Sequence, residues 1–134
     1  MVCIYCGSKT QIINSRPQKR LNRTWRRHKC LQCQAVFTTE ESVHYEGSIV
    51  VRQPQGALLP FSRDKLFASV LRAVGHRVSP IEDAGALTAT ITARLVHQNT
   101  SGALTPSDII LATQDTLRHF DSAAAVQYQA YHKG

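Results

Sequence analysis

Two cysteine pairs constrain the fold of this chain more than any other feature of its sequence. Cys3 and Cys6 form one C-x2-C pair, Cys30 and Cys33 form the other, and these four are all the cysteines in the chain. Each pair places two thiolates on one tight turn, and two such turns complete a tetrahedral shell around one ion, with zinc–sulfur distances of about 2.3 Å. We therefore predict a closed structural Zn²⁺ site formed by all four cysteines.

Other uses of four cysteines stay open but fit the sequence less well. The chain begins close to the first pair with no signal-peptide pattern, so we expect a cytoplasmic protein, in which disulfides rarely persist. A thioredoxin-type dithiol needs one pair in a βαβ setting, which this segment lacks. An iron–sulfur cluster is the other four-thiolate alternative. No apolar run approaches the roughly 20 residues that span a bilayer, so we expect no membrane partner.

Positive charge is concentrated around the cysteines. The 134-residue chain carries 16 lysines and arginines against 9 acidic residues, a formal net charge of +7. All the lysines and arginines among residues 1–46 fall between positions 9 and 29. Clustered cations neutralise phosphates and release counterions, which predicts a polyanionic partner such as nucleic acid. A solvated basic face without a partner is the alternative.

The first third of the chain is predicted to form a small antiparallel sheet. Gln11–Asn14, Thr24–Lys29 and Ala35–Thr39 are rich in β-branched and aromatic residues, and we expect Arg16–Arg20 to form a turn. A segment of this length buries too little apolar surface to fold unaided, and a bound metal supplies the missing stability.

Alternation along the second of these strands predicts two different faces. Trp25, Arg27 and Lys29 lie on one side, and Arg26 and His28 lie on the other. We expect Trp25 to pack over the metal core, because so small a unit has few large apolar side chains. Stacking of Trp25 on a nucleic-acid base is the alternative.

From residue 47 the pattern changes to a β-hairpin followed by helices. Ser48–Arg52 and Ala57–Phe61 are extended runs around the turn Gln53–Gly56, with Pro60 favouring an edge strand. Helix-start signals then recur at Ser62, Ser79, Thr105 and Asp121. The residues expected to face inward are Leu66, Phe67, Val70, Leu71, Val74, Ala84, Leu87, Ile91, Leu95, Ile109, Ile110, Thr113, Leu117, Ala124, Ala125, Val126 and Tyr128. The predicted fold class is α+β, with domains at residues 1–46 and 47–134.

No catalytic constellation is recognisable in the second domain. It contains neither a G-x-x-x-x-G-K-[ST] phosphate loop nor a G-x-G-x-x-G turn. The six histidines of the chain are scattered, which favours surface or packing roles for them over ligand or base roles. Pattern alone therefore predicts an α+β domain whose purpose stays unknown.

The two halves together resemble the NrdR-type bacterial repressors of ribonucleotide reductase genes. The resemblance covers nearly the whole chain and rests on the two cysteine pairs, Ile13–Arg16, Arg26-Arg27, Phe37–Thr39, Val50–Arg52, the turn at Gly56, and Pro60–Leu66. The chain has Trp25-Arg26-Arg27-His28 where the family usually has four arginines.

The resemblance implies a cytoplasmic, nucleoid-associated repressor without enzymatic activity. Residues 1–46 would be a zinc ribbon that binds double-stranded operator DNA, and residues 47–134 an ATP-cone that senses ATP against dATP and sets a homo-oligomeric state. It assigns DNA contact to Arg16, Arg26, Arg27, His28 and Lys29. It assigns nucleotide binding to Val50, Val51, Arg52, Lys65, Arg77 and Tyr128.

Two further functions remain as alternatives. One is a generic nucleic-acid-binding zinc ribbon, for RNA or DNA, joined to a degenerate nucleotide-binding cone. The other is an accessory piece of a ribonucleotide reductase, which is disfavoured because the chain is too short for a radical-chemistry barrel and has no thiol left once four bind zinc.

Overall fold

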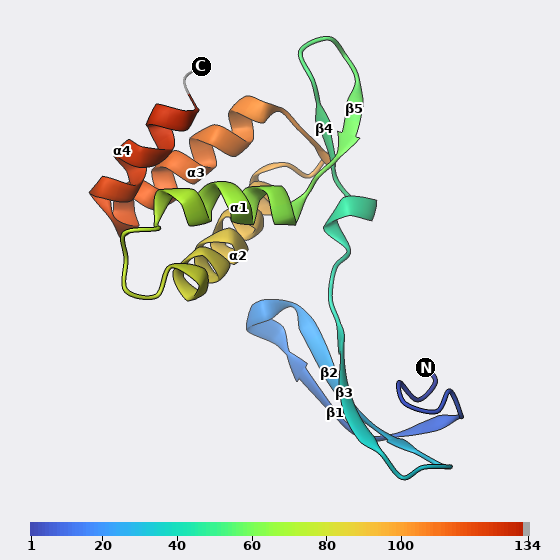
Figure 1. Ribbon diagram of the computed structural model, residues 1–134. Coiled ribbons are helices and arrows are strands. Elements are labelled where there is room, and N and C mark those ends of the chain that lie inside the picture. Colours follow the sequence, from blue (N-terminus) through green and yellow to red (C-terminus); the bar gives the residue numbers. More distant parts are fainter. Residues whose placement is uncertain (133–134) are drawn as a thin grey trace. The chain divides into compact units, whose positions relative to one another are not determined.

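The computed structural model describes residues 1–132, which form two compact units (Figure 1). The first unit ends at His44 and the second begins at Tyr45. This division falls two residues before the one we predicted. The reason is that the Tyr45 ring packs edge-on against Phe61, with ring centroids 6.5 Å apart, and so belongs to the second unit. The fold class is α+β, as predicted.

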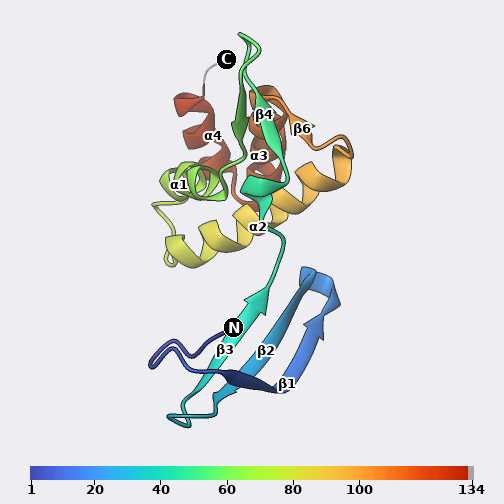
Figure 2. The ribbon, with the colours of Figure 1, turned by 90° about the vertical axis from the view of Figure 1, so that its right-hand side faces the viewer.

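The first unit is a three-stranded antiparallel sheet in the order β1-β2-β3 (Figure 2). The strands are β1 at Thr10–Gln18, β2 at Arg23–Cys30 and β3 at Val36–Glu41. We expected a turn or loop at Arg16–Arg20, and this was wrong for Arg16, Pro17 and Gln18, because β1 continues to Gln18. An edge strand tolerates proline, because the backbone N–H that proline lacks is not needed to pair with a neighbouring strand there.

The buried core of the first unit is very small. It consists of Cys3, Cys30 and Phe37, with Ala35 packed against them. Trp25 is not part of it: its side chain is 39% exposed. Our prediction that Trp25 covers the metal core was therefore wrong. Strand alternation explains why, since Cys30 points into the core and Trp25, an odd number of residues away, points to the opposite face.

The second unit begins with the predicted hairpin. Strands β4 at Val50–Arg52 and β5 at Leu58–Pro60 pair antiparallel, and β5 is an edge strand, as Pro60 indicated. Gly56 has φ +96° in the connecting turn, a conformation that favours glycine. We did not predict β6 at Ala103–Leu104, which pairs parallel with β4 and carries the buried Leu104.

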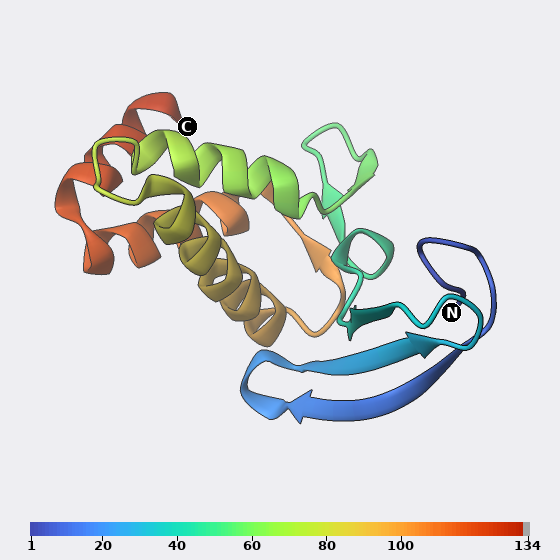
Figure 3. The same cartoon turned by 60° about the horizontal axis from the view of Figure 1, so that its bottom comes forward.

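Four helices complete this unit: α1 at Arg63–Ala73, α2 at Pro80–Gln98, α3 at Pro106–Phe120 and α4 at Ser122–Tyr131. Each packs on two others, α1 on α2 and α4 and α3 on the same pair, which closes a four-helix bundle (Figure 3). No helix within residues 1–132 combines the length and apolar character needed to cross a membrane.

The helix caps and inward faces largely follow the sequence prediction. Side chains of Ser62, Thr105 and Asp121 cap α1, α3 and α4, whereas Ser79 makes no side-chain cap at α2. Val126 is 68% exposed, contrary to our prediction. The buried stripe of α4 is Ala124 and Tyr128, four residues apart, and a residue midway between them points away.

Candidate functional site

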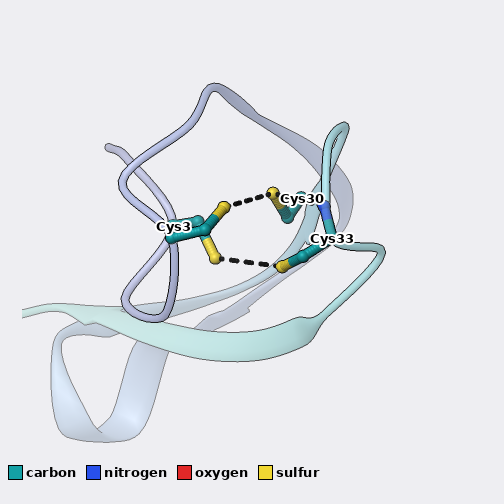
Figure 4. Close-up of side chains that lie close together, drawn as sticks. Cys3, Cys30 and Cys33 are labelled. Atoms are coloured by element: carbon teal, nitrogen blue, oxygen red, sulfur yellow. Dashed lines mark hydrogen bonds between the residues drawn. The ribbon is translucent and has the colours of Figure 1, made fainter.

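Four cysteine thiols converge at one end of the first unit. Cys3 and Cys6 lie on the turn before β1, Cys30 is the last residue of β2, and Cys33 lies on the turn between β2 and β3. All are free thiols, and their Sγ atoms lie within 4.8 Å of one another. The Sγ atoms of Cys3 and Cys33 are 3.7 Å apart and those of Cys6 and Cys30 are 3.5 Å apart, with the side chains directed toward a common point (Figure 4).

This spacing fits a tetrahedral zinc ion. Zinc–sulfur bonds of about 2.3 Å require sulfur–sulfur edges of about 3.8 Å, close to the separations found here. Backbone N–H groups also point at the sulfurs: Tyr5 donates to Cys3 Sγ at 3.4 Å, and Gln32 donates to Cys30 Sγ at 3.3 Å. These donors stabilise thiolates, the form that binds metal.

The electrostatics of the cluster also call for a cation. The hydroxyl and the backbone N–H of Ser8 lower the pKa of the Cys6 thiol to about 6. The backbone N–H of Ala35 favours the Cys33 thiolate, but burial and the other three sulfurs outweigh it and raise the pKa of Cys33 to about 11. Four thiolates this close together therefore need a neutralising ion, and Zn²⁺ is the ion that suits a four-sulfur tetrahedron.

His28, which we predicted to contact DNA, is buried. It is 5% exposed, its ring stacks on Phe37 with centroids 5.2 Å apart, and its Nε2 lies 2.8 Å from the Thr39 hydroxyl. His28 shares the sheltered face of β2 with Cys30, because the two are two residues apart on one strand. The structure thus gives His28 a packing role beside the metal site, and its contact with DNA stays a prediction.

The opposite face of the sheet is open and basic. We call it the open face and define it by Arg16, Trp25, Arg27 and Lys29 with their cross-strand neighbours. Register places Arg16 directly opposite Trp25, and Asn14 and Thr38 on either side of Arg27. Within residues 1–132, Arg16, Arg27 and Lys29 form no ion pair, in contrast to Arg23 and Arg26. A hollow of about 480 Å³ there is lined by Asn14, Arg16, Trp25, Arg26, Arg27 and Thr38.

Arg26 and Arg27 are adjacent in sequence but differ in surroundings. The Nη1 of Arg26 donates to Glu41 Oε2 at 2.8 Å, which neutralises this cation. Arg26 also alternates with Arg27 along β2, so its side chain leaves the opposite side of the strand, although Arg26 still borders the hollow. Of the five residues predicted to contact DNA, the structure therefore groups Arg16, Arg27 and Lys29 as unpaired cations on one face.

The second unit contains a cavity of about 280 Å³ beneath the hairpin and against α1, α3 and α4. Three residues predicted to bind nucleotide line it: Val51, Lys65 and Tyr128. Val50 and Arg52, the neighbours of Val51 on β4, are not among its lining residues. The lining residues that we did not predict are Gln53, Leu59, Pro60, Phe61, Ser62, Leu66, Ser69, Pro106, Ile109, Ile110 and His132.

The wall of the cavity is mostly apolar, with few polar groups. Lys65 is the only lysine or arginine that lines it among the described residues. Tyr128 is 2% exposed, and burial raises the pKa of its hydroxyl. His132 stacks on Tyr128 with centroids 4.1 Å apart and its Nδ1 lies 3.1 Å from the Tyr128 carbonyl oxygen. The sequence signal for His132 was its spacing of four residues from Tyr128, which brings the residue just after α4 over the Tyr128 ring.

Arg77 is not among the residues that line this cavity, and its binding of nucleotide stays a prediction. Its Nε donates to Asp83 Oδ2 at 2.7 Å, its Nη1 donates to Asp121 Oδ2 at 2.9 Å, and its guanidinium lies 4.4 Å from the Phe120 ring centroid. His76 and Arg77 together hold the pKa of Asp121 well below its usual range. This cluster joins the loop after α1 to the starts of α2 and α4, which is a structural role.

Comparison with known proteins places these features in one family. Residues 1–41 match the model of the N-terminal domain of NrdR-like transcriptional repressors. Over 99% of its length the chain is 33% identical to the transcriptional repressor NrdR of Symbiobacterium thermophilum, covering 87% of that protein. It is 33% identical to the NrdR of Methylorubrum extorquens strain PA1 and covers 71% of that protein. It is 31% identical to the NrdR of Streptococcus gordonii and covers 84% of that protein. All three names describe regulators of transcription, not enzymes, and the chain thus belongs to the NrdR family of transcriptional repressors.

Proposed function

We propose that this protein represses ribonucleotide reductase genes by binding double-stranded operator DNA through the open face of its zinc ribbon. We further propose that ATP or dATP, bound in the cavity of the second unit, controls this binding. The observation that carries the proposal is the set of three unpaired cations, Arg16, Arg27 and Lys29, on one exposed sheet face. Membership of a repressor family supports DNA as the polyanion.

The two arginines are the main candidates for DNA contact. Planar guanidinium groups bind phosphates, or the O6 and N7 atoms of guanine, through two parallel hydrogen bonds. Lys29 adds a point charge that suits a phosphate. Arg26 is already bound to Glu41, so contact with DNA would first have to break that ion pair.

The cavity of the second unit is suited to an adenine nucleotide. Its apolar wall, which includes Phe61 and Tyr128, can enclose a purine, while Lys65 can bind a phosphate. The N-terminus of α1, capped by Ser62, borders the same cavity, and its backbone dipole favours an anion. Arg52, exposed at the end of β4, is a further cation for the phosphates.

Control by nucleotide would act through assembly of the chain into homo-oligomers. One ribbon is small, so tight binding requires several ribbons that engage one operator together. A nucleotide that favours an assembly with the correct ribbon spacing increases DNA affinity, and one that favours a different assembly decreases it. Such a repressor acts in the cytoplasm, associated with the nucleoid.

A gel-shift titration tests this function. The zinc-loaded full chain is titrated onto promoter DNA of a ribonucleotide reductase gene from the same genome, alone, with ATP and with dATP. We expect one nucleotide to tighten binding and the other to weaken it. Calorimetric titration with each nucleotide, repeated with Lys65→Ala, locates the effect in the cavity. If neither nucleotide changes the DNA affinity and neither gives a heat of binding, the result would instead favour a generic ribbon with a degenerate cone.

Two neighbouring arginines give a matched test of the open face. Arg27→Ala should weaken operator binding and reduce the slope of log affinity against log salt by about one, because one phosphate contact is lost. Arg26→Ala removes the same charge from a side chain held by Glu41 and should leave the slope nearly unchanged. Equal slopes in the two variants would contradict the assignment of the open face to DNA.

A further inference from the structure

We propose that the open face of the ribbon is also a base-stacking site, at which Trp25 holds one unpaired DNA base. The proposal rests on the proposed function in that the partner is DNA. The stacking site goes beyond the proposed function because phosphate binding alone needs no aromatic residue. It also adds a preference for DNA that exposes a base.

Packing in the metal core does not account for the position of Trp25. It is 39% exposed, and the metal core of the unit is built without it. It lies on the central strand β2, paired with Arg16 of β1 on one side and Glu40 of β3 on the other. A backbone hydrogen-bonded on both sides is rigid, so the indole is presented to solvent from a fixed platform.

The indole is held in place by its neighbours on the same face. The guanidinium of Arg23 lies 5.1 Å from the ring centroid, and its Nη1 forms an ion pair with Glu40 Oε1 at 2.8 Å. A cation over a ring is attracted by its π-electrons, and the ion pair fixes that cation. Trp25 also borders the hollow of about 480 Å³ on the open face.

The surroundings of this ring suit a nucleotide. Arg16 lies directly opposite Trp25 and Arg27 follows it by two residues on the same face, and neither forms an ion pair within residues 1–132. Asn14 and Thr38, in register with Arg27, offer an amide and a hydroxyl that can bind base edges. Proteins that bind single strands combine these parts: a stacking aromatic residue, cations along the backbone, and a sheet that presents both.

The geometry of stacking selects DNA with an unpaired base. In a closed duplex both faces of each base are covered by its neighbours, and only groove edges and phosphates are accessible. A base can lie against an indole only after it has left the stack. Promoter DNA exposes such bases when its strands separate, and a repressor that binds promoters encounters them there.

Trp25 is the only tryptophan in the chain, so its fluorescence reports this site alone. The zinc-loaded full chain is titrated with three DNA probes of one sequence: a fully paired duplex, the same duplex with a single-base bulge, and one strand. We expect the bulged duplex and the single strand to quench the emission, and the paired duplex to leave it nearly unchanged. Anisotropy of labelled DNA should give a preference of about 5- to 100-fold for the bulged over the paired duplex.

Substitutions at Trp25 should separate stacking from charge. Trp25→Leu keeps apolar bulk but removes the ring, and should reduce binding of the bulged duplex by about 5- to 100-fold while paired-duplex binding stays within about twofold. Trp25→Phe keeps a ring and should retain most of the preference. Tyr5→Leu is the matched control, because Tyr5 is an exposed aromatic residue of the same unit on the first cysteine turn. Zinc content and far-UV circular dichroism establish that each variant is folded.

The outcomes distinguish this proposal from the proposed function. The stacking site would be overturned by unchanged tryptophan emission at saturating DNA, or by an equal loss of affinity for the bulged and the paired duplex in Trp25→Leu. Binding of the paired operator would still support the repressor function. Failure of the unaltered protein to bind any DNA probe would overturn the proposed function. Tighter binding of an RNA strand than of the DNA strand would overturn DNA as the stacking partner.

Discussion

The two units of this protein are stabilised by different means. The hydrophobic core of the ribbon consists only of Cys3, Cys30 and Phe37, two of which are metal ligands. The second unit buries a cluster of 16 hydrophobic residues that spans its sheet and all four helices. The ribbon therefore depends on its ion, whereas the helical unit has an apolar core large enough to fold alone. Because the ion rather than apolar packing holds the ribbon, one face of its sheet stays free for the charged and aromatic residues that we propose bind DNA.

Metal removal should have the largest effect and should act on one unit only. Structural zinc contributes about 10–16 kcal/mol of apparent binding energy in small peptides, more than a ribbon of this size can replace. We expect a strong chelator to abolish the dispersed amide resonances of the ribbon and to leave those of the second unit in place. Two-dimensional NMR of the full chain makes the measurement, and restored zinc should restore the spectrum.

Two results of that measurement would break the comparison between the units. Loss of all dispersed resonances would mean that the helical bundle needs the metal as well. Retention of the ribbon resonances would mean that its strands hold together without an ion.

A core substitution in the second unit should have the next largest effect, with no effect on the metal. Leu117 of α3 is fully buried, and Leu117→Ala should lower the free energy of unfolding of this unit by about 2–5 kcal/mol through lost burial and a cavity. Leu111→Ala, on the same helix but 64% exposed, is the control and should change it by less than about 0.5 kcal/mol. Urea unfolding followed by circular dichroism gives both values, and zinc content should equal that of the unaltered protein.

Acid should weaken the helical unit through Asp121, in a pH range set by that carboxylate. His76 and Arg77 hold the pKa of Asp121 well below its usual range. The stabilisation from its charge is therefore complete above the pKa of this carboxyl in the unfolded chain, about 3.9, and is lost as pH falls below that value. Asp121→Asn keeps an acceptor for the N–H groups of Ala123 and Ala124 but loses the charge. We expect the variant to unfold at lower urea than the unaltered protein at pH 7, and the gap to shrink at pH 3.

An unchanged gap between pH 7 and pH 3 would show that the stabilising contribution of Asp121 is its cap and not its charge. The metal site provides a second readout, since the substitution lies in the other unit and should leave zinc affinity unaltered.

Local patterns predicted most of the fold and only part of the sites. The cysteine spacing, the alternation of β2 and the caps Ser62 and Thr105 are short-range signals, and the structure confirms each. The same alternation already separated Trp25 from Cys30, so the error at Trp25 came from expecting a large apolar residue to be buried. Strand β6 is two residues long, too short to show any periodicity.

The remaining features depend on contacts between distant residues. Arg77 meets Asp121 across 44 positions, and nothing near Arg77 distinguishes an ion-paired cation from one that binds phosphate. The cavity combines β4, β5 and three helices, so its wall is defined only once these elements are packed. The pairing of Arg26 with Glu41, which leaves Arg27 free, likewise requires the register of β2 and β3.

The two cysteine turns allow the finest test of how the metal organises the ribbon. Both turns contain the same backbone hydrogen bond, from Cys3 N to Ser8 O and from Cys30 N to Ala35 O, each 2.8 Å long. Gly7 in the first turn has φ +75°, and Gln34 in the second has φ +65°. Left-handed backbone costs a residue with a side chain about 1–2 kcal/mol, and glycine avoids this cost.

Exchange of these residue types should therefore move zinc affinity in opposite directions. Gly7→Ala should lower it by about 5- to 30-fold, and a Cβ there meets no atom within 4 Å, so the loss is conformational and not steric. Gln34→Gly should raise it by less, up to about fivefold, because it also removes the bond from Gln34 Nε2 to the Leu31 carbonyl oxygen at 3.3 Å. Competition with a chelator of known affinity measures both. A weaker site in Gln34→Gly would mean that this hydrogen bond outweighs the backbone strain, so that the two turns are held by different forces.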